Sequence, residues 1–433
     1  MDKRELEKIG TLDVIHLWMM FDGNTTRLQM VAEMADPVDE LILKQAVKSN
    51  LKVFTNFRKK IVIYDNNFWF ADNQNEVPVF RNDGKVRALC SEDTNRYPFY
   101  ISFDEMNITF TFTHVVADGT GMYLFYDSVI KTYLRDRYPG EFEFNETSLT
   151  ESTPFRDIAE PLELYEEKKQ TNITGGTIPN QKSFNFRDCT SEEADVRALI
   201  RMPEDKVIEL TKSWGVKPAA FIMTVFNTAV RNTYGLKDTG LIGGIMTDLR
   251  RRTGVYPLRN FSGIMFIETN PDNLKADFTE ECKAVEEKIE KALEESDFSL
   301  NSSKGVAELF TKVPGSVQTK IATVKKMIGD AGKSVASYQM SYMRMGEHDE
   351  WYRSRVKGMK FTMFPSASGT PLIEAFSQDG IMTWEIIFLP DRETITAEIS
   401  RLLAELGIEC QVSKRTDSCK DYLDLERIEV IPE

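Results

Sequence analysis

The sequence predicts an α/β protein of two lobes, each a mixed, largely antiparallel sheet covered by helices. The chain of 433 residues is long enough to bury two hydrophobic cores. Strand-like alternation and helix-like periodicity follow one another in both halves, and a polar, acidic stretch interrupted by Gly and Pro separates the halves. We therefore expect an N-terminal lobe at residues 1–140, a crossover at 141–195 and a C-terminal lobe at 196–433.

In the N-terminal half, turn residues divide a series of short apolar segments. The turn at Asp65-Asn66-Asn67 separates two segments that should pair as antiparallel strands. The expected elements are one or two strands over 11–34 with a turn at 22–24, a helix over 37–50, strands at 60–64, 68–71, 99–103 and 108–114, and a helix to about 138.

A second α/β series follows the crossover. Pro218 and Gly235 bracket one helix with the usual Pro at its start and Gly after its end, and Asp379-Gly380 is typical of a hairpin turn. The expected elements are helices at 203–214 and 218–234, strands at 241–247 and 263–269, helices at 278–295 and within 305–328, strands at 335–343, 360–364, 372–378 and 381–388, and a helix at 391–406. After Gly407 the tail is either an extra strand or an extension.

Composition excludes several functional classes. A formal net charge of −14 argues against nonspecific nucleic-acid binding, which needs a basic surface. The five cysteines are scattered and form no C-x-x-C pair, and the three histidines are also scattered, so we expect no metal site and reduced thiols in a cytoplasmic protein. The charged first eight residues have no signal-peptide core, and no apolar run reaches the ~18 residues of a membrane span.

The segment 108–121 is the main candidate for a functional site. Period-two alternation places Phe110, Phe112 and His114 on the core face of one strand, where an imidazole needs a partner. A buried imidazole at a strand–loop–helix corner suits a general base. The structural alternative is a hydrogen-bonded core histidine.

Four residues later, Asp118 and Gly119 precede an amphipathic helix. Its apolar face consists of Met122, Phe125, Tyr126, Val129, Ile130 and Tyr133. The alternative role for Asp118 is simply to cap this helix. His16, among apolar neighbours, is as readily a core or channel-lining residue, and we assign it no function.

The segment resembles the His-x-x-x-Asp-Gly signature of the chloramphenicol-acetyltransferase-like superfamily, which includes peptide-synthetase condensation domains and alcohol acetyltransferases. The resemblance implies two α/β lobes with a tunnel between them. Many members carry two adjacent histidines, whereas Thr113 occupies the first position here. This departure favours a free-standing acyltransferase over a condensation domain. The Asp-Phe-Gly-Trp-Gly motif of the plant branch is absent.

The resemblance also implies roles for further residues. The motif aspartate of the family pairs with an arginine, for which Arg250 is the first candidate and Arg251 the second. Together with Arg252 these form either a solvated basic turn or a group that helps to hold coenzyme A phosphates. Gly119 is expected to serve backbone conformation or close approach of substrate.

Candidates for oxyanion or substrate contacts come from two further resemblances. Asn260 lies in a segment similar to the family's Asn-Phe-x-Gly, and Ser341-Tyr342 resembles a Ser-Tyr or Ser-Asn pair near the active centre. The alternative for each is strand-edge polarity.

The resulting hypothesis is acyl transfer from acyl-coenzyme A to a small-molecule alcohol or amine, with His114 as the base. No G-x-S-x-G elbow is present, which favours direct attack over an acyl-enzyme. Two alternatives stay open. One is an enzyme that takes its acyl group from an acyl carrier protein, and the other is a non-catalytic binding protein that retains the fold.

Overall fold

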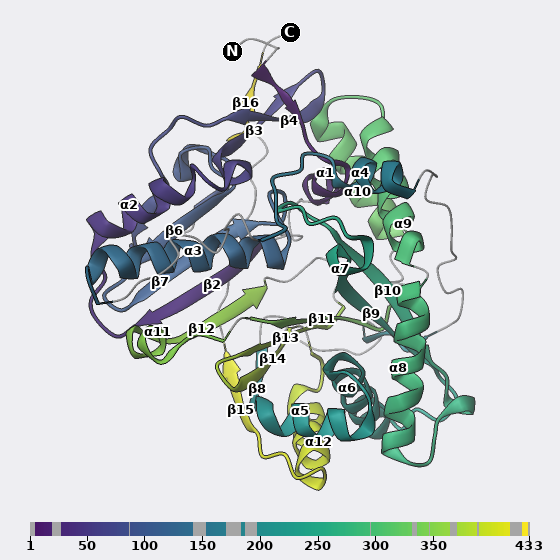
Figure 1. The fold of residues 1–433 in the computed structure, drawn as a ribbon. Coiled ribbons are helices and arrows are strands. Elements are labelled where there is room, and N and C mark those ends of the chain that lie inside the picture. The colour runs from purple at the N-terminus through teal and green to yellow at the C-terminus, as the bar shows by residue number, and fades with distance from the viewer. Residues whose placement is uncertain are drawn as a thin grey trace.

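The computed structural model describes residues 5–19, 27–85, 87–141, 153–169, 183–186, 197–294, 296–330, 336–345, 347–363, 370–387, 389–415 and 427–431. These residues form two α/β lobes with a small third sheet beside the two termini (Figure 1). The turn expected at 22–24 and most of the expected crossover lie outside the described residues.

The N-terminal lobe has a five-stranded sheet in the order β12-β2-β7-β6-β5, antiparallel except for the last pair. Two helices, α2 and α3, cover one face of it (Figure 1). The elements are β2 (Arg27–Met34), α2 (Glu40–Asn50), β5 (Val79–Arg81), β6 (Phe99–Phe103), β7 (Asn107–Thr113), α3 (Gly119–Arg137) and β12 (Val356–Met363). Phe110 and Phe112 are fully buried against α3, as the alternation predicts.

The C-terminal lobe has a mixed seven-stranded sheet in the order β10-β9-β11-β13-β14-β8-β15. Its strands are β8 (Arg197–Pro203), β9 (Leu241–Asp248), β10 (Ser262–Thr269), β11 (Tyr338–Arg344), β13 (Leu372–Gln378), β14 (Ile381–Ile387) and β15 (Gln411–Arg415). The helices of this half are α5 (Glu204–Trp214), α6 (Pro218–Tyr234), α7 (Arg250–Thr253), α8 (Phe278–Glu294), α9 (Ser296–Lys312), α10 (Val317–Asp330), α11 (Glu350–Arg355) and α12 (Arg392–Glu405).

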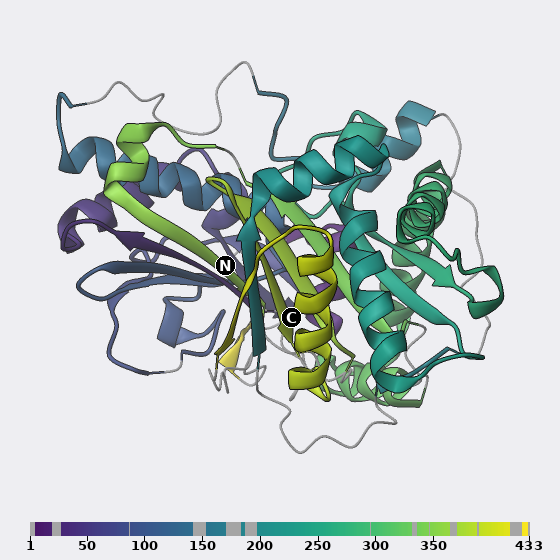
Figure 2. The ribbon, with the colours of Figure 1, turned by 90° about the horizontal axis from the view of Figure 1, so that it is seen from below.

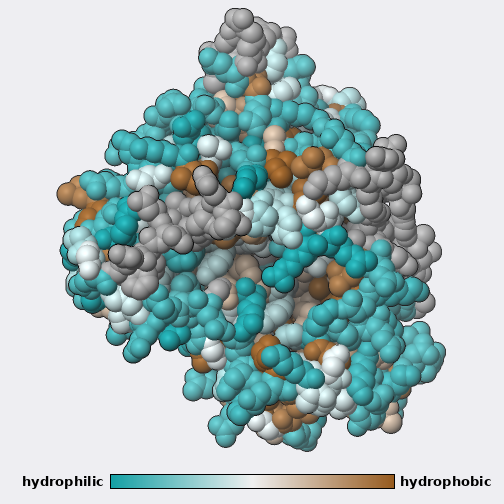
Figure 3. Space-filling model, in the orientation of Figure 1, coloured by the Kyte–Doolittle hydropathy of each residue, from teal (hydrophilic) through white to brown (hydrophobic). Residues whose placement is uncertain are grey.

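Helices α6 and α12 cover the face of this sheet that points away from the N-terminal lobe (Figures 1 and 2). Side chains of that face, such as Met340 and Trp384, belong to the core of the C-terminal lobe. Because side chains alternate along a strand, Ser341 and Glu374 lie on the opposite face, which is turned toward the N-terminal lobe. The space-filling view is hollowed between the two lobes (Figure 3).

The remaining elements lie at the edges of the molecule. β1 (Glu7–Lys8), β4 (Asn67–Asp72), β3 (Lys59–Tyr64) and β16 (Glu429–Val430) form the third sheet, and α4 (Pro161–Lys169) packs near α1. No helix in the described part of the chain has the length and apolar character needed to cross a membrane.

Two differences from the sequence-based expectations affect the site. The first is that residues 11–18, expected as a strand, form helix α1 (Thr11–Trp18). Glu160 accepts hydrogen bonds from the backbone N–H and the hydroxyl of Thr11, at 2.8 and 2.9 Å. A carboxylate that binds a free N–H of the first turn stabilises a helix that its β-branched residues alone would not favour.

The second difference concerns the lobe boundary. β12 comes from the C-terminal half of the chain but pairs with β2 along seven positions, from Val356 with Met34 to Met363 with Leu28. Residues 196–433 therefore do not form one lobe by themselves. The exchanged strand ties the halves together through backbone hydrogen bonds.

Candidate functional site

His114 lies directly after strand β7, in the short loop that leads into α3. The loop is fixed at its far end because Asp118 caps α3, accepting a hydrogen bond from the Gly121 N–H at 3.2 Å. The ring of His114 is partly exposed, whereas Val115, Val116 and Ala117 are buried. A buried loop between a rigid strand and a rigid helix holds the imidazole at a defined position.

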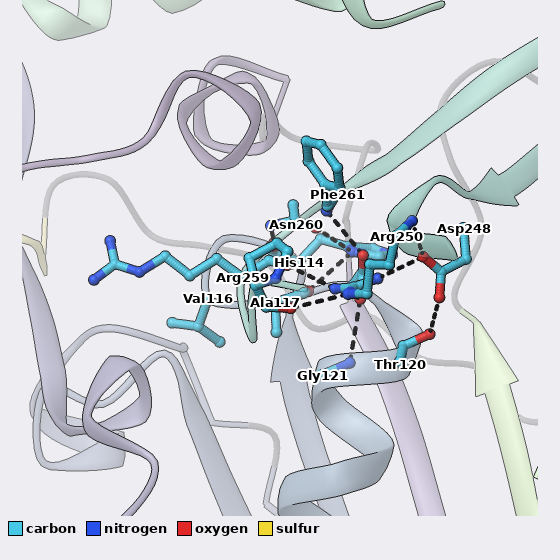
Figure 4. A network of polar contacts seen from close by, with 12 residues as sticks. His114, Val116, Ala117, Thr120, Gly121, Asp248, Arg250, Arg259, Asn260 and Phe261 are labelled. Carbon is cyan, nitrogen blue, oxygen red and sulfur yellow. Dashed lines mark hydrogen bonds and ion pairs between the residues drawn. The ribbon is translucent and has the colours of Figure 1, made fainter. Parts of the chain in front are cut away.

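One nitrogen of His114 is held by the protein and the other is not. Nδ1 lies 3.2 Å from the carbonyl oxygen of Ala117 and 3.3 Å from Oδ1 of Asn260 (Figure 4). Both partners are acceptors, so Nδ1 carries the proton. Nε2 then bears the lone pair, and it has no hydrogen-bond partner among the described residues.

Asn260 sets this tautomer because its own orientation is determined. Its amide nitrogen donates to Oδ1 of Asp13 and to the backbone oxygen of His114, each at 2.6 Å. The amide oxygen must therefore face Nδ1 of His114. His114, carried by the N-terminal lobe, is thus oriented by Asn260, which precedes β10 in the C-terminal half.

The electrostatic surroundings keep His114 neutral near pH 7. Burial lowers the pKa of His114, and the nearby Asp118 carboxylate, Asn260 and the Ala117 carbonyl oppose this effect without cancelling it. An imidazole that is neutral and has an open Nε2 can accept a proton.

The structure brings Asp118 and Arg250 together in a buried ion pair. Nη2 of Arg250 lies 2.9 Å from Oδ1 of Asp118, and the two side chains are 1% and 6% exposed. The second carboxylate oxygen accepts a hydrogen bond from the Phe261 N–H at 2.9 Å. Both carboxylate oxygens of Asp118 therefore accept hydrogen bonds from groups in the other half of the chain.

The guanidinium of Arg250 donates four hydrogen bonds to described residues in this position. Besides Asp118, the acceptors are the carbonyl oxygens of Pro257 and Arg259, at 2.9 and 2.8 Å, and Asp248 at 3.0 Å. Burial alone would lower the pKa of Arg250, but Asp118 and Asp248 outweigh it and raise that pKa. The neighbouring Arg251 and Arg252, in contrast, are exposed, so α7 presents two cations to solvent.

The glycine that requires close approach is Gly121 rather than Gly119. A Cβ added to Gly121 would lie 2.0 Å from the carbonyl oxygen of Leu258, whereas one added to Gly119 would meet only Sδ of Met343, at 3.6 Å. Gly119 also has no positive φ. The backbone of Gly119 therefore does not require a glycine, whereas Gly121 does, because α3 touches the segment before β10 there; close approach of substrate to Gly119 stays a prediction.

The three oxyanion candidates are placed differently from one another. Asn260 has committed both of its N–H groups, so it orients His114 and does not serve as an oxyanion donor. The Tyr342 hydroxyl lies 3.2 Å from the Ser377 hydroxyl, on the core face of β11. Ser341 is on the face turned toward the N-terminal lobe.

Ser341 is hydrogen-bonded to a buried carboxyl group, that of Glu374. Burial raises the pKa of Glu374 to about 8, an effect that the nearby Glu385 increases and the hydrogen bond from Ser341 opposes. Glu374 and Glu385 are directly opposite on β13 and β14, and Arg197 lies 3.2 Å from Glu385. At neutral pH, Arg197 and Glu385 then form an ion pair, Glu374 is protonated, and Ser341 is hydrogen-bonded to Glu374.

Two residues of α1 lie beside the site although the sequence assigned them no role in it. Asp13 is 1% exposed and supports Asn260, accepting hydrogen bonds from its amide and its backbone N–H at 2.6 and 3.2 Å. One turn later, the ring of His16 stacks on that of His114, with centroids 4.7 Å apart and planes 14° apart. A helical assignment for 11–18 would have placed Asp13 and His16 on one face.

The described residues contain no group of three or more His, Cys, Asp or Glu that could hold a metal ion. Two surface pockets lie away from His114. One is beside β10 and α8, lined in part by Phe266 and Lys288, and the other is between α6 and α8, lined in part by Arg231 and Glu281.

Comparison with known proteins identifies the fold. No protein-family model matches the sequence, and no curated protein is significantly similar to it. Solved structures, however, match over nearly the whole chain. The first condensation domain of the CDA synthetase is 13% identical, with a TM-score of 0.62 and coverage of 93% of this chain and 96% of that one.

Two further solved structures match similarly. Polyketide synthase associated protein 5 from Mycobacterium tuberculosis is 12% identical, with a TM-score of 0.60 and coverage of 92% and 98%. TRI3 trichothecene 15-O-acetyltransferase from Fusarium sporotrichioides is 10% identical, with a TM-score of 0.54 and coverage of 92% and 94%. This chain therefore has the two-lobed fold shared by condensation domains and this acetyltransferase, the chloramphenicol-acetyltransferase-like fold, and the predicted fold class is confirmed.

Proposed function

We propose that this protein is an acyltransferase that moves an acyl group from acyl-coenzyme A to a hydroxyl or amine, with His114 as general base. The observation that carries the proposal is the state of the His114 ring. Nδ1 is fixed by two acceptors, while Nε2 has no partner among the described residues and the ring is partly exposed. Catalytic activity in proteins of the same fold is consistent with this role.

The reaction is direct attack in a ternary complex. The acceptor loses its proton to Nε2 of His114 as its oxygen or nitrogen bonds to the thioester carbon, and the carbonyl electron pair moves to oxygen. Collapse of this tetrahedral species breaks the carbon–sulfur bond, and the thiolate takes the proton from the imidazolium. Ser341, on the inward face of β11, is the candidate for hydrogen bonding to the developing oxyanion.

The experiment is a free-thiol assay with acetyl- and octanoyl-coenzyme A and a panel of alcohols and amines. We expect thiol release that depends on the acceptor. His114→Ala should reduce kcat about 10²- to 10⁴-fold, the usual contribution of a positioned base. His114→Asn is the matched variant, since it keeps an N–H near the position of Nδ1 but has no basic nitrogen, and it should be equally impaired. Thiol release no higher than background in wild type and both variants would support a non-catalytic protein instead, and equal release above background would mean that His114 is not the base.

A second candidate donor is an acyl group on the phosphopantetheine arm of a carrier protein. It is favoured by the likeness to condensation domains and to a polyketide synthase associated protein. The exposed cations Arg251 and Arg252 allow a test between the two donors. Coenzyme A carries phosphates beyond its pantetheine arm that these cations could bind, and S-acyl pantetheine does not. If coenzyme A is the donor, R251S/R252S should raise KM for acetyl-coenzyme A and leave KM for acetyl-pantetheine unchanged. Transfer from an acylated carrier protein alone would assign the carrier instead.

A further inference from the structure

The strongest feature that the proposed reaction leaves unused is His16. Its ring is stacked on the ring of the base, with centroids 4.7 Å apart and an interplanar angle of 14°. The two histidines are 98 positions apart in sequence, on α1 and after β7. Stacking at this distance places the ring of His16 directly beside the ring of His114, so a substrate bound at Nε2 of His114 would also lie near His16.

His16 carries two polar ring nitrogens in a partly buried position. Neither of its ring nitrogens has a hydrogen-bond partner among the described residues, although the ring is partly buried. Asp13, one turn before it, accepts from Asn260 through Oδ1, while its buried Oδ2 has no hydrogen-bond partner among the described residues. A polar ring left open in a largely enclosed place is satisfied by a ligand or by water.

The surroundings also fix the protonation state of His16. Burial holds the pKa of His16 well below its ordinary value, and the adjacent His114 lowers it further. A neutral imidazole still carries one N–H, so His16 remains a hydrogen-bond donor at neutral pH. Two stacked neutral rings do not repel each other as two imidazolium ions would.

We propose that His16 is a second catalytic residue, whose N–H donates a hydrogen bond to the acyl carbonyl oxygen while His114 removes the proton of the acceptor. The proposal rests on the function proposed above and assigns the oxyanion contact to His16 in place of Ser341, the first candidate. In the attack, the new bond forms at the carbonyl carbon and the carbonyl electron pair moves to the oxygen that faces His16. The proton passes from the acceptor to His114 and then to the thiolate, and His16 keeps its own proton throughout.

This assignment agrees with the placement of the other donors. The N–H groups of Asn260 are committed to Asp13 and to the His114 backbone oxygen. The hydroxyl of Tyr342 lies on the core face of β11. Ser341 is the competing donor, but its hydroxyl already donates a hydrogen bond to the carboxyl group of Glu374.

The test replaces His16 in three ways and measures kcat, KM and the melting temperature. His16→Phe keeps a flat ring for stacking but removes both nitrogens. The pair His16→Gln and His16→Met compares side chains of similar length, of which only Gln has N–H donors. We expect His16→Phe and His16→Met to lose about 10²- to 10³-fold in kcat, with KM little changed, and His16→Gln to recover at least tenfold of that loss.

The outcomes separate a failure of the role proposed for His16 from a failure of the proposed acyl-transfer function. If wild type transfers acyl groups and His16→Phe retains kcat within about twofold, the ring acts only by stacking and the proposal is wrong. If Ser341→Ala shows the 10²-fold loss and His16→Phe does not, the donor is Ser341. If His16→Phe does not fold, equal kcat of the Gln and Met variants overturns the proposal. If wild type itself releases no thiol with any donor, the proposed function fails, and the role of His16 fails with it.

Discussion

Replacing Asp118 by Asn tests whether the ion pair with Arg250 holds the two halves of the site together. The change keeps the shape of the side chain but removes its charge and puts an NH₂ group opposite either the Phe261 N–H or the Arg250 guanidinium. Removing one partner of a buried pair typically costs about 3–5 kcal/mol, because the other charge is left uncompensated. Arg250 keeps Asp248 and two carbonyl oxygens, so we expect the lower end, about 3 kcal/mol.

The expected shift in melting temperature follows from the size of the protein. Unfolding entropy of about 2.1 cal/mol/K per residue gives roughly 0.9 kcal/mol/K for the 433 residues. A loss of about 3 kcal/mol then lowers Tm by roughly 3 °C, and one of 5 kcal/mol by roughly 6 °C.

Differential scanning calorimetry measures this shift, and Asp248→Asn is the matched control. Asp248 contacts the same arginine, but its side chain is 44% exposed, so its variant should lose at most about 1 kcal/mol. The rate of acyl transfer should fall with Asp118→Asn, because the loop that carries His114 loses its anchor. A melting curve identical to that of wild type would contradict the role of Asp118 as the partner of a buried cation.

Three further predictions concern the same corner. Gly121→Ala should destabilise the protein by about 1–3 kcal/mol, because its Cβ would lie 2.0 Å from the Leu258 carbonyl oxygen. Gly119→Ala, the control, should change Tm by less than a degree, and thermal unfolding of both variants measures the difference. Burial raises the pKa of Asp13 to about 7, so the native state keeps a proton that the unfolded chain releases near 3.8. The resulting contribution to stability is lost as pH rises from about 4 to 7. Denaturant titrations should therefore show that the stability of Asp13→Asn depends less on pH than that of wild type, and an unchanged pH dependence would contradict the raised pKa of Asp13. Asn260→Ala should lower kcat about 10- to 100-fold and move the acidic limb of the kcat/KM pH profile to lower pH, because the Asn260 hydrogen bond raises the pKa of His114.

The fold was largely predictable because most elements carry their own periodicity. Helix α3 runs from Gly119 to Arg137 with the predicted apolar face fully or nearly fully buried, and α6 begins at Pro218 and ends before Gly235 as its Pro and Gly predict. The exchange of β12 was not predictable, since its pairing with β2 depends on which sheet edge is open in the folded chain. Local patterns specify a strand but not its neighbour.

Helix α1 was missed for a different reason. Its eight residues, Thr11 to Trp18, include β-branched side chains and fit either secondary structure. The contact that favours the helix comes from Glu160, 149 positions away. Because this error hid the i, i+3 relation of Asp13 and His16, two of the residues nearest to His114 could not be recognised from the sequence.

The other candidate site residues were proposed from their resemblance to short segments of a known family, but their separate roles could be read only from coordinates. Two consecutive residues before β10 act on the His114 loop in different ways: Asn260 determines which nitrogen of His114 carries the proton, and the Phe261 N–H binds the carboxylate of Asp118. The carbonyl oxygen of Arg259, just before them, holds Arg250. A segment of the C-terminal half therefore sets both the position and the tautomer of a histidine carried by the N-terminal lobe. It follows that a substitution that alters the spacing of the lobes changes the chemistry of His114 even when it touches neither the ring nor a substrate.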